Sequence, residues 1–351
     1  MRQVIFLLSA LIPLVLCHGW NSWTNYWQSQ GYFYGSQYAD RAYSVSACPD
    51  ECDCPSSFPV AMYCNGRGLT TVPPIPSHIK YLYLQHNAIT SLPDSALSNA
   101  TNLVWLMLHF NQLTSESIGK KAFVKLGELE RLYLQYNNLT SIPSNLPLCL
   151  RDLRMDNNMI EKVNLQKFTF GMDNLTILYL HDNALSEVGS SLKGLNSLTL
   201  LDLSSNKLTK VPAPLPAYLH QLYLEYNAID SIPEGFLSLF SQLQYFRMSH
   251  NLLTNKGIPA NTFNVSGLVE LDLSFNKLER IPSVSTTLQY LYLQANQIKG
   301  EKFTVGSFCS VVDVTNFSRL LMVRLDGNEL SLVDIPTDVS HCLRQVLDIE
   351  I

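Results

Sequence analysis

A repeating pattern of leucine and asparagine positions runs through most of the chain. The pattern Leu-x-x-Leu-x-Leu-x-x-Asn-x-Leu, with Ile also accepted at its end, fits residues 129–139, 198–208, 219–229, 268–278 and 288–298. Its asparagine recurs along the chain at Asn87, Asn111, Asn137, Asn158, Asn183, Asn206, Asn227, Asn251, Asn276, Asn296 and Asn328. Successive asparagines lie 20 to 26 residues apart, except in the last step of 32 residues. Periods of this length indicate a stacked array of small repeating units.

The pattern predicts one short strand in each unit. In x-Leu-x-Leu-x the leucines point to one side and the intervening residues to the other, because side chains alternate along a strand. Stacked units then share one core, since no single unit can bury its leucines alone. The asparagine amide both donates and accepts, so we expect the column of asparagines to satisfy turn backbone groups. The predicted fold is an α/β-type leucine-rich-repeat solenoid with a curved parallel β-sheet on its concave face and disulfide caps at both ends.

The segments outside the repeats predict the remaining organisation. Arg2 and the apolar stretch that follows it are typical of a signal peptide, and this stretch is too short to span a bilayer. A segment rich in Trp, Tyr, Ser and Gln comes next, and we expect a flexible tail there. The predicted divisions are a signal peptide at 1–17 (ending between 17 and 19), a tail at 18–47, an N-terminal cysteine cap at 48–64, repeats at 65–308, and an extended last repeat with the C-terminal cap at 309–351.

Cysteine usage supports secretion. Cys48, Cys52, Cys54 and Cys64 have the spacing C-x3-C-x-C-x9-C, for which disulfides and a zinc site are the alternatives. Secretion favours disulfides. We expect Cys309 and Cys342 to bridge around the last repeat, which would contribute about 3–4 kcal/mol by restricting the unfolded chain. Cys149 stands alone in mid-chain, and we expect it to be unpaired.

Composition and charge exclude several functions. A formal net charge of −5 argues against a nucleic-acid partner, which would require a basic face. Beyond the first residues, no stretch is long and apolar enough for a transmembrane helix, so we expect no membrane partner. The sequence holds no metalloprotease, phosphate-loop, nucleophile-elbow or dinucleotide motif. We therefore expect a secreted, extracellular protein that is not an enzyme and uses no cofactor or metal.

The concave face is the predicted partner-binding surface. The outward positions of the strands carry tyrosine and arginine, which are enriched in binding hot spots. Tyrosine also simply suits a strand surface, which is the structural alternative. The candidate residues are Tyr133, Arg154, Tyr179, Asp202, Tyr223, Glu225, Arg247, Glu270, Asp272, Tyr292 and Arg324. Their interleaved charges favour a polar, rod-like partner that carries both signs.

Two kinds of modification are also predicted. The sequons at Asn99, Asn138, Asn174, Asn264 and Asn316 are plausible N-glycan sites in a secreted chain. Asn99, Asn264 and Asn316 each precede the first leucine of a strand by four residues, so glycans there should leave the concave face clear. In the tail, Tyr38 and Tyr43 are candidate sulfotyrosines, although only Asp40 supplies a nearby acid; an unmodified tail is the alternative.

The cap spacing, the repeat lengths and the 32-residue last step together resemble the small leucine-rich proteoglycans. The resemblance covers nearly all of the chain after residue 47 and is strongest to the class with fibromodulin, lumican and keratocan, and within it to fibromodulin-like chains. Residues 52–64, 187–194, 307–318 and 349–351 carry it. It implies Cys48–Cys54 and Cys52–Cys64 pairing, keratan sulfate on repeat asparagines, and collagen binding. It also adds Glu329 to the partner-binding set, although Ser331 stands where the family has a lysine.

The leading hypothesis is an extracellular-matrix proteoglycan core protein that binds fibrillar collagen through its concave face and regulates fibril assembly. Growth factors of the matrix are further candidate partners. One alternative is a soluble recognition module that binds a growth factor or a microbial ligand. Another is a glycan-modifying enzyme, which is disfavoured because no acid pair or nucleophile–base set can be placed in the sequence.

Overall fold

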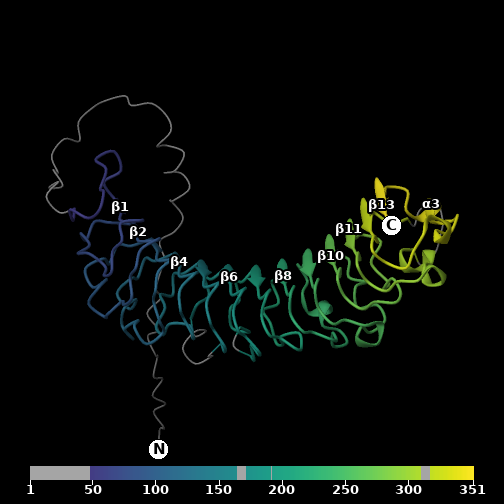
Figure 1. Cartoon of the computed structure of the whole chain (residues 1–351), viewed down its shortest axis with the longest axis horizontal. Coiled ribbons are helices and arrows are strands. Elements are labelled where there is room, and N and C mark those ends of the chain that lie inside the picture. The colour runs from purple at the N-terminus through teal and green to yellow at the C-terminus, as the bar shows by residue number, and fades with distance from the viewer. Residues whose placement is uncertain (1–47, 164–170, 191, 310–316) are drawn as a thin grey trace, which may run out of the picture. The chain divides into compact units, whose positions relative to one another are not determined.

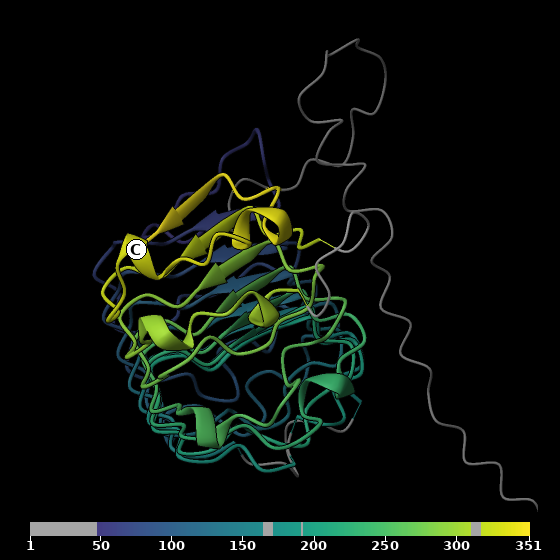
Figure 2. The same ribbon diagram turned by 90° about the vertical axis from the view of Figure 1, so that its right-hand side faces the viewer.

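The computed structural model describes residues 48–163, 171–190, 192–309 and 317–351. Contacts divide the chain into the units Met1–Val45 and Ser46–Ile351, and only the second contains described residues. Within it, one parallel sheet of thirteen strands lies along the inner side of the repeats (Figure 1). All of these strands point the same way (Figure 2).

Each strand is three residues long, and neighbouring strands pair in chain order without any crossover. The strands are β1 (Ala61–Tyr63), β2 (Tyr81–Tyr83), β3 (Trp105–Met107), β4 (Arg131–Tyr133), β5 (Asp152–Arg154), β6 (Ile177–Tyr179), β7 (Leu200–Asp202), β8 (Gln221–Tyr223), β9 (Tyr245–Arg247), β10 (Glu270–Asp272), β11 (Tyr290–Tyr292), β12 (Met322–Arg324) and β13 (Asp348–Glu350).

The core follows from the alternation along these strands. The middle residue of β2 to β12 is buried, whereas the first and third residues are mostly half-buried on the opposite face. The leucines on either side of the middle position in the pattern are also buried, such as Leu219 and Leu224 around Leu222. Each fully buried leucine contributes about 1.5–3 kcal/mol relative to an exposed one. One continuous cluster of such residues runs through the whole array.

The predicted asparagine column is present in every repeat from Asn87 to Asn328. Asn111 shows the arrangement: its Nδ2 donates to the carbonyls of Leu84 and Leu108, both at 3.0 Å. Its Oδ1 accepts from the backbone N–H of Ile89 at 3.0 Å. Each asparagine thus ties its own turn to the preceding repeat, as the sequence predicted. We call this column the asparagine ladder.

Short helices lie in the connecting segments and at the C-terminal end. They are the 3-10 helices η2 (Leu237–Leu239), η3 (Asn255–Gly257), η4 (Gly300–Lys302), η5 (Val305–Ser307) and η6 (Leu332–Asp334), and the α-helix α3 (Val339–Cys342). In the described ranges, none of the helices is long and apolar enough to cross a membrane.

Disulfides close both ends of the array. At the N-terminal end, Cys48 is bonded to Cys54 and Cys52 to Cys64. At the C-terminal end, Cys309 is bonded to Cys342, the last residue of α3. These are the pairings expected from the sequence and the family resemblance. The expectation for Cys149 was wrong, because this cysteine is disulfide-bonded. Isolation in the sequence says nothing about which chain segments meet in space.

Candidate functional site

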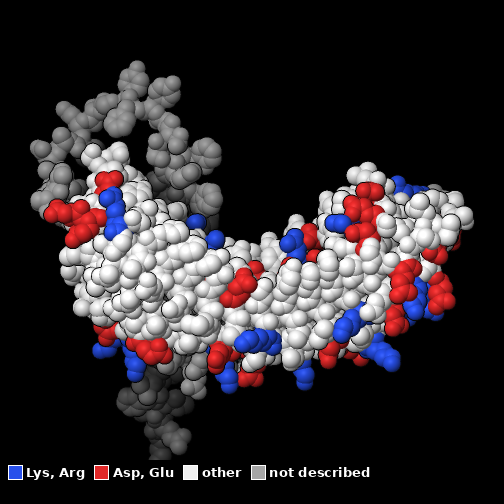
Figure 3. Space-filling model, viewed as in Figure 1, with Lys and Arg blue, Asp and Glu red and all other residues white. Residues whose placement is uncertain are grey.

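Nine of the predicted partner-binding residues form one column on the concave face. Each is the third residue of its strand: Tyr133, Arg154, Tyr179, Asp202, Tyr223, Arg247, Asp272, Tyr292 and Arg324, in β4 to β12. Strand pairing places each beside the next. Repeat geometry therefore makes direct neighbours of residues that lie 20–25 positions apart in the sequence, or 32 for Tyr292 and Arg324. Side chains of both charges lie along the concave edge (Figure 3).

Arg154 lies between two aromatic rings. Its guanidinium carbon is 4.6 Å from the ring centre of Tyr133 and 5.1 Å from that of Tyr179. Two of its nitrogens donate to the carboxylate of Asp152, each at 3.1 Å. The Tyr133 hydroxyl donates to the same carboxylate at 2.7 Å, and burial together with this bond raises the pKa of Tyr133 to about 12. This forked, stacked arrangement holds the guanidinium in one orientation and presents it to the concave face.

Arg247 repeats this arrangement four repeats later. Its guanidinium carbon lies 5.0 Å from the ring centre of Tyr223, and its Nε donates to Glu270 at 2.6 Å. Tyr223 in turn donates its hydroxyl to Gln221. Glu270 is the first residue of β10, which pairs directly with β9, so its carboxylate reaches Arg247 from the neighbouring strand. The concave face thus holds two arginine sites of similar construction.

The acids near these two sites differ in their surroundings. Asp202 accepts from the N–H and hydroxyl of Ser204, and Asp272 does the same with Ser274. Glu225 lies two residues after β8, and one of its carboxylate oxygens is buried without a hydrogen-bond partner in the described part of the chain. Burial, reinforced by the charge of Asp202, raises the pKa of Glu225 to about 7. This carboxyl is therefore partly protonated near neutral pH.

A histidine joins two acids near the middle of the face. His181 lies 3.5 Å from Asp156 through Nε2 and 3.5 Å from Asp202 through Nδ1. Burial raises the pKa of Asp156 above its ordinary value. Among the described residues, no group of three or more His, Cys, Asp or Glu is arranged to hold a metal ion.

At the C-terminal end of the column, Arg324 is held by acids. Arg324 forms ion pairs with Asp326 at 3.1 Å and with Glu350 of β13 at 2.6 Å. Glu329, predicted to share the face, does not lie on it. It follows ladder residue Asn328, outside the strands, and is exposed. The error arose because Glu329 was carried over from the family resemblance rather than read from the strand pattern, which places residues after the ladder at the edge of the sheet.

The N-terminal end of the face is aromatic. The strand pattern places Tyr81, Tyr83 and Trp105 on this face, although they are outside the set of candidate partner-binding residues. Tyr63 stacks on Tyr83 with ring centres 4.7 Å apart, and Tyr81 meets Trp105 edge to face. Arg131 lies over Trp105 at 4.4 Å. Asp152, which holds Arg154, was also omitted. The signal for it was available, because the first strand position in that repeat is an acid where neighbouring repeats have Arg, Ile or Leu.

The predicted modification sites lie away from the strands. Asn99 and Asn264 are exposed in connecting segments, and Asn138 is exposed directly after ladder residue Asn137. Asn174 is half-buried, and its Nδ2 donates to the carbonyl of Leu148. Asn316 and the tail residues Tyr38 and Tyr43 fall outside the described residues, as do the predicted signal peptide and tail.

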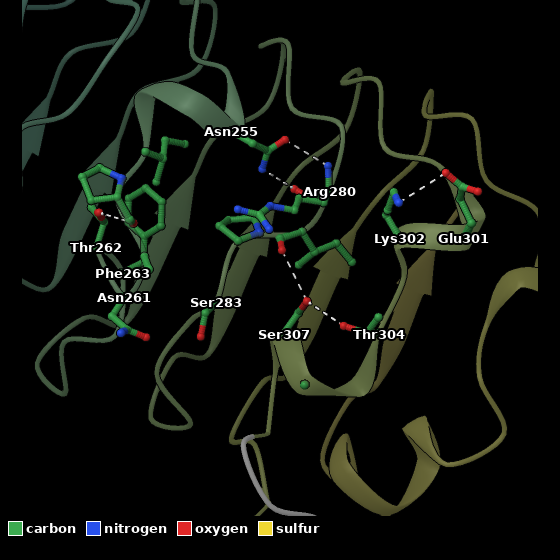
Figure 4. A pocket seen from close by; sticks show the side chains of 16 residues that line it. Asn255, Asn261, Thr262, Phe263, Arg280, Ser283, Glu301, Lys302, Thr304 and Ser307 are labelled. Carbon is green, nitrogen blue, oxygen red and sulfur yellow. Dashed lines mark hydrogen bonds and ion pairs between the residues drawn. The ribbon is translucent and has the colours of Figure 1, made fainter.

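A cavity of about 380 Å³ lies behind the sheet, between the connecting segments of three repeats (Figure 4). Its apolar wall includes Phe263 and Ile281. Its polar groups bond mainly to one another: Asn255 exchanges hydrogen bonds with the Arg280 backbone, and Ser307 donates to Ile281. The lining holds neither a pair of carboxylates nor a nucleophile beside a base, so its residues offer no catalytic chemistry.

Comparison with known proteins agrees with this geometry. A leucine rich repeat family model matches residues 77–139 and 149–208, and a leucine rich repeat N-terminal domain model matches residues 47–76. Fibromodulin of Bos taurus is 54% identical over 312 residues, which cover 87% of this chain and 80% of the relative. The chain belongs to the small leucine-rich proteoglycan family.

Other relatives place this small leucine-rich proteoglycan in the same group. Lumican of Gallus gallus is 46% identical over 310 residues, covering 88% of this chain and 90% of the relative. A chain of the "Octameric complex of Latrophilin 3 (Lec, Olf), Unc5D (Ig, Ig2, TSP1) and FLRT2 (LRR)" aligns with a TM-score of 0.66 and 27% identity, over 86% of this chain and 83% of that one. A leucine-rich-repeat protein of Leptospira interrogans, 23% identical with a TM-score of 0.62, shares the fold.

Family membership fixes the broad class of this protein. The small leucine-rich proteoglycans are structural, non-enzymatic proteins of the extracellular matrix, and this chain is a secreted member. The concave column described above is a part of the molecule where the side chains differ from strand to strand.

Proposed function

We propose that this proteoglycan core protein binds fibrillar collagen through its concave face and regulates fibril assembly. The observation that carries the proposal is the pair of oriented arginines, Arg154 and Arg247, on a column whose other members are tyrosines, acids and Arg324. Orientation matters because a side chain already held in place loses less entropy when it binds. A partner that carries both charges along a rod would meet both arginines and the acids beside them.

The predicted glycans would add a spacing function. Asn99 and Asn264 are exposed in connecting segments, away from the strands. A bound molecule would therefore keep its glycans off the collagen contact and project them from the fibril. Hydrated, charged sugar resists close approach, so a coated fibril would fuse less readily with its neighbours.

The test is binding of the secreted, glycosylated protein to fibrillar collagen, with the turbidity of fibril assembly followed in parallel. The variant Tyr223→Ala, Arg247→Ala, Glu270→Ala removes one arginine site. We expect it to lose binding by roughly 10- to 100-fold, because buried aromatic and arginine anchors dominate such interfaces. The matched control is Tyr218→Ala, Lys210→Ala, Glu234→Ala, which removes the same kinds of side chain from exposed positions away from the strands. Equal affinity in the two variants would contradict the concave-face site.

A second function is favoured by one comparison. The similar solenoid is part of an octameric complex with latrophilin 3 and Unc5D, so a chain of this fold can take part in an assembly with other proteins. By the same use of the fold, this chain would be a soluble recognition module for a growth factor or a microbial ligand. Folded, glycosylated protein that does not bind fibrillar collagen at all, but captures such a ligand, would favour this function instead.

A further inference from the structure

A second surface lies at the edge of the sheet toward which all the strands point. The residue directly before each ladder asparagine has a left-handed backbone, with φ between 50° and 57° in the repeats from His86 to Ala295. We call this column the rim. Bulky side chains rarely adopt such a backbone, and Asn tolerates it best after glycine. Six rim positions nevertheless carry aromatic rings: His86, Phe110, Tyr136, Tyr226, His250 and Phe275.

These rings form two stacks of three. In the first, Phe110 lies 4.4 Å from His86 and 4.1 Å from Tyr136 between ring centres. In the second, His250 lies 4.1 Å from Tyr226 and 4.0 Å from Phe275. The planes within each stack are nearly parallel, at 10–11°. The three repeats between the stacks carry polar residues instead, namely Asn157, Asp182 and Ser205.

The stacks expose much apolar surface. Phe110 is 40% exposed, Tyr136 44%, Tyr226 56% and Phe275 46%. Met159 and Leu252, which directly follow ladder asparagines, are also exposed, at 50% and 41%. The rim faces the viewer in Figure 1, and the same side in Figure 3 shows wide uncharged stretches between its concave and convex edges. Contiguous exposed apolar patches of this kind mark interaction sites.

We propose that the two stacks dock one uncharged, imino-acid-rich triple helix that lies along the rim. This inference rests on the proposed function and assigns collagen segments without charged residues to a surface distinct from the concave face. The six ring positions carry no Lys, Arg, Asp or Glu, so a charged segment would lose water there without gaining an ion pair. Extended proline-rich chains, by contrast, dock on aromatic surfaces, and the triple helix is built from such chains.

The spacing of the stacks matches a repeating rod. Six repeats separate Phe110 from His250, the centres of the two stacks. Six steps from one repeat to the next span roughly 25 Å if each step equals the ring spacing within the stacks. They span roughly 29 Å if each step equals the usual spacing between strands. One Gly-X-Y triplet rises roughly 9 Å, so three triplets span roughly 28 Å. Equivalent apolar side chains of one triple helix therefore reach both stacks at once, which a compact ligand would not do.

The test uses the secreted full-length chain with two probes: fibrillar collagen and a neutral triple-helical peptide of Gly-Pro-Pro repeats. The rim variants are Phe110→Asn with Tyr136→Asn, and Tyr226→Asn with Phe275→Asn. Asn157 already occupies the same left-handed position in this chain, so the substitutions suit the backbone. The control is Tyr218→Asn, at an equally exposed tyrosine away from the rim. All proteins that are compared, the reference chain included, carry Asn138→Gln, which removes the predicted glycan two residues from Tyr136.

Each rim pair should weaken binding of the neutral peptide by about tenfold, whereas the control should not. That binding should change little with salt, because no ion pair is involved. Unchanged peptide affinity in both rim variants overturns the proposal. A loss of peptide binding that is fully explained by a lowered thermal stability of the variants overturns it as well. A chain that binds fibrillar collagen but not the neutral peptide overturns the rim proposal while the proposed function stands. A chain that binds neither probe overturns both.

Discussion

The asparagine ladder and the concave column are built from the same repeats, yet they use sequence in opposite ways. Every ladder position from Asn87 to Asn328 is the same residue with the same backbone partners. The concave column, only a few residues earlier in each repeat, changes its residue type from strand to strand. The ladder position is fixed because it satisfies buried backbone groups, whereas the concave position is free because it faces outward.

This difference teaches where to look for function in a repeat protein. A residue type that recurs at the same position in every repeat is needed by the fold. A position that varies while its neighbours stay constant is available to a partner. The concave column and the rim both satisfy this second criterion, and the predictions below test it by changing one column at a time.

The largest expected effect is on the ladder. Asn251→Ala removes donations to the Leu224 and Met248 carbonyls and leaves the Ile229 N–H, held at 2.9 Å, without its acceptor. Asn251 is buried, so we expect the free energy of unfolding to fall by about 3–5 kcal/mol. Urea denaturation followed by circular dichroism measures this.

Two further variants sharpen the ladder prediction. Asn251→Asp keeps an acceptor for the Ile229 N–H and should be less damaging at low pH, where the carboxyl can also donate. Asn196→Ala removes an exposed asparagine that bonds Asp173 and should change stability by less than about 0.5 kcal/mol. A similar loss of stability in Asn251→Ala and Asn196→Ala would show that a ladder asparagine contributes no more to the fold than an exposed one.

The next effect concerns Glu225 on the concave face. Its pKa in the folded chain is about 7, against an ordinary 4.5, so the folded state binds the proton more tightly than the unfolded state. Stability from this group is therefore fully present below about pH 4.5 and is lost as the pH rises through 7. We expect a loss of about 1–3 kcal/mol over this range in the wild type.

Glu225→Gln should remove this dependence, because an amide does not titrate. The measurement is the difference between the urea midpoints of wild type and variant at several pH values, since histidines affect both proteins equally. Above neutral pH the urea midpoint of the variant should exceed that of the wild type. This difference between the two midpoints should shrink at low pH. Parallel pH profiles would mean that Glu225 does not carry the effect.

Most of the fold was predictable from the sequence, because the period of the leucines and asparagines is a direct consequence of stacking. The strand positions and the ladder followed from that period, the C-terminal bridge followed from the two cysteines around the last repeat, and the N-terminal cap pairing followed from the family resemblance. The bonded state of Cys149 could not be predicted in this way. A disulfide depends on which cysteines meet in space, and the period of the repeats does not report this.

The concave column was also predictable, because alternation within a strand determines which residues face outward. What the sequence could not show was which of these residues hold one another. Asp152 was overlooked although it binds both Arg154 and Tyr133. The rim was not predicted, because the strand pattern does not cover the position before each ladder asparagine, and only the structure shows that the aromatic rings there stack and remain exposed.

The smallest effect tests whether the concave ion pairs serve the fold or the face. Arg247 and Glu270 meet at 2.6 Å, but the arginine side chain is more than a third exposed. We expect a double-mutant cycle with Arg247→Met and Glu270→Gln to give a coupling energy of only about 0.3–1 kcal/mol, because solvent screens the pair. The same cycle measured on collagen affinity should give a larger coupling, since a bound partner excludes that solvent. A coupling of several kcal/mol in the free protein would instead make the pair a structural element, and the concave column would then resemble the ladder after all.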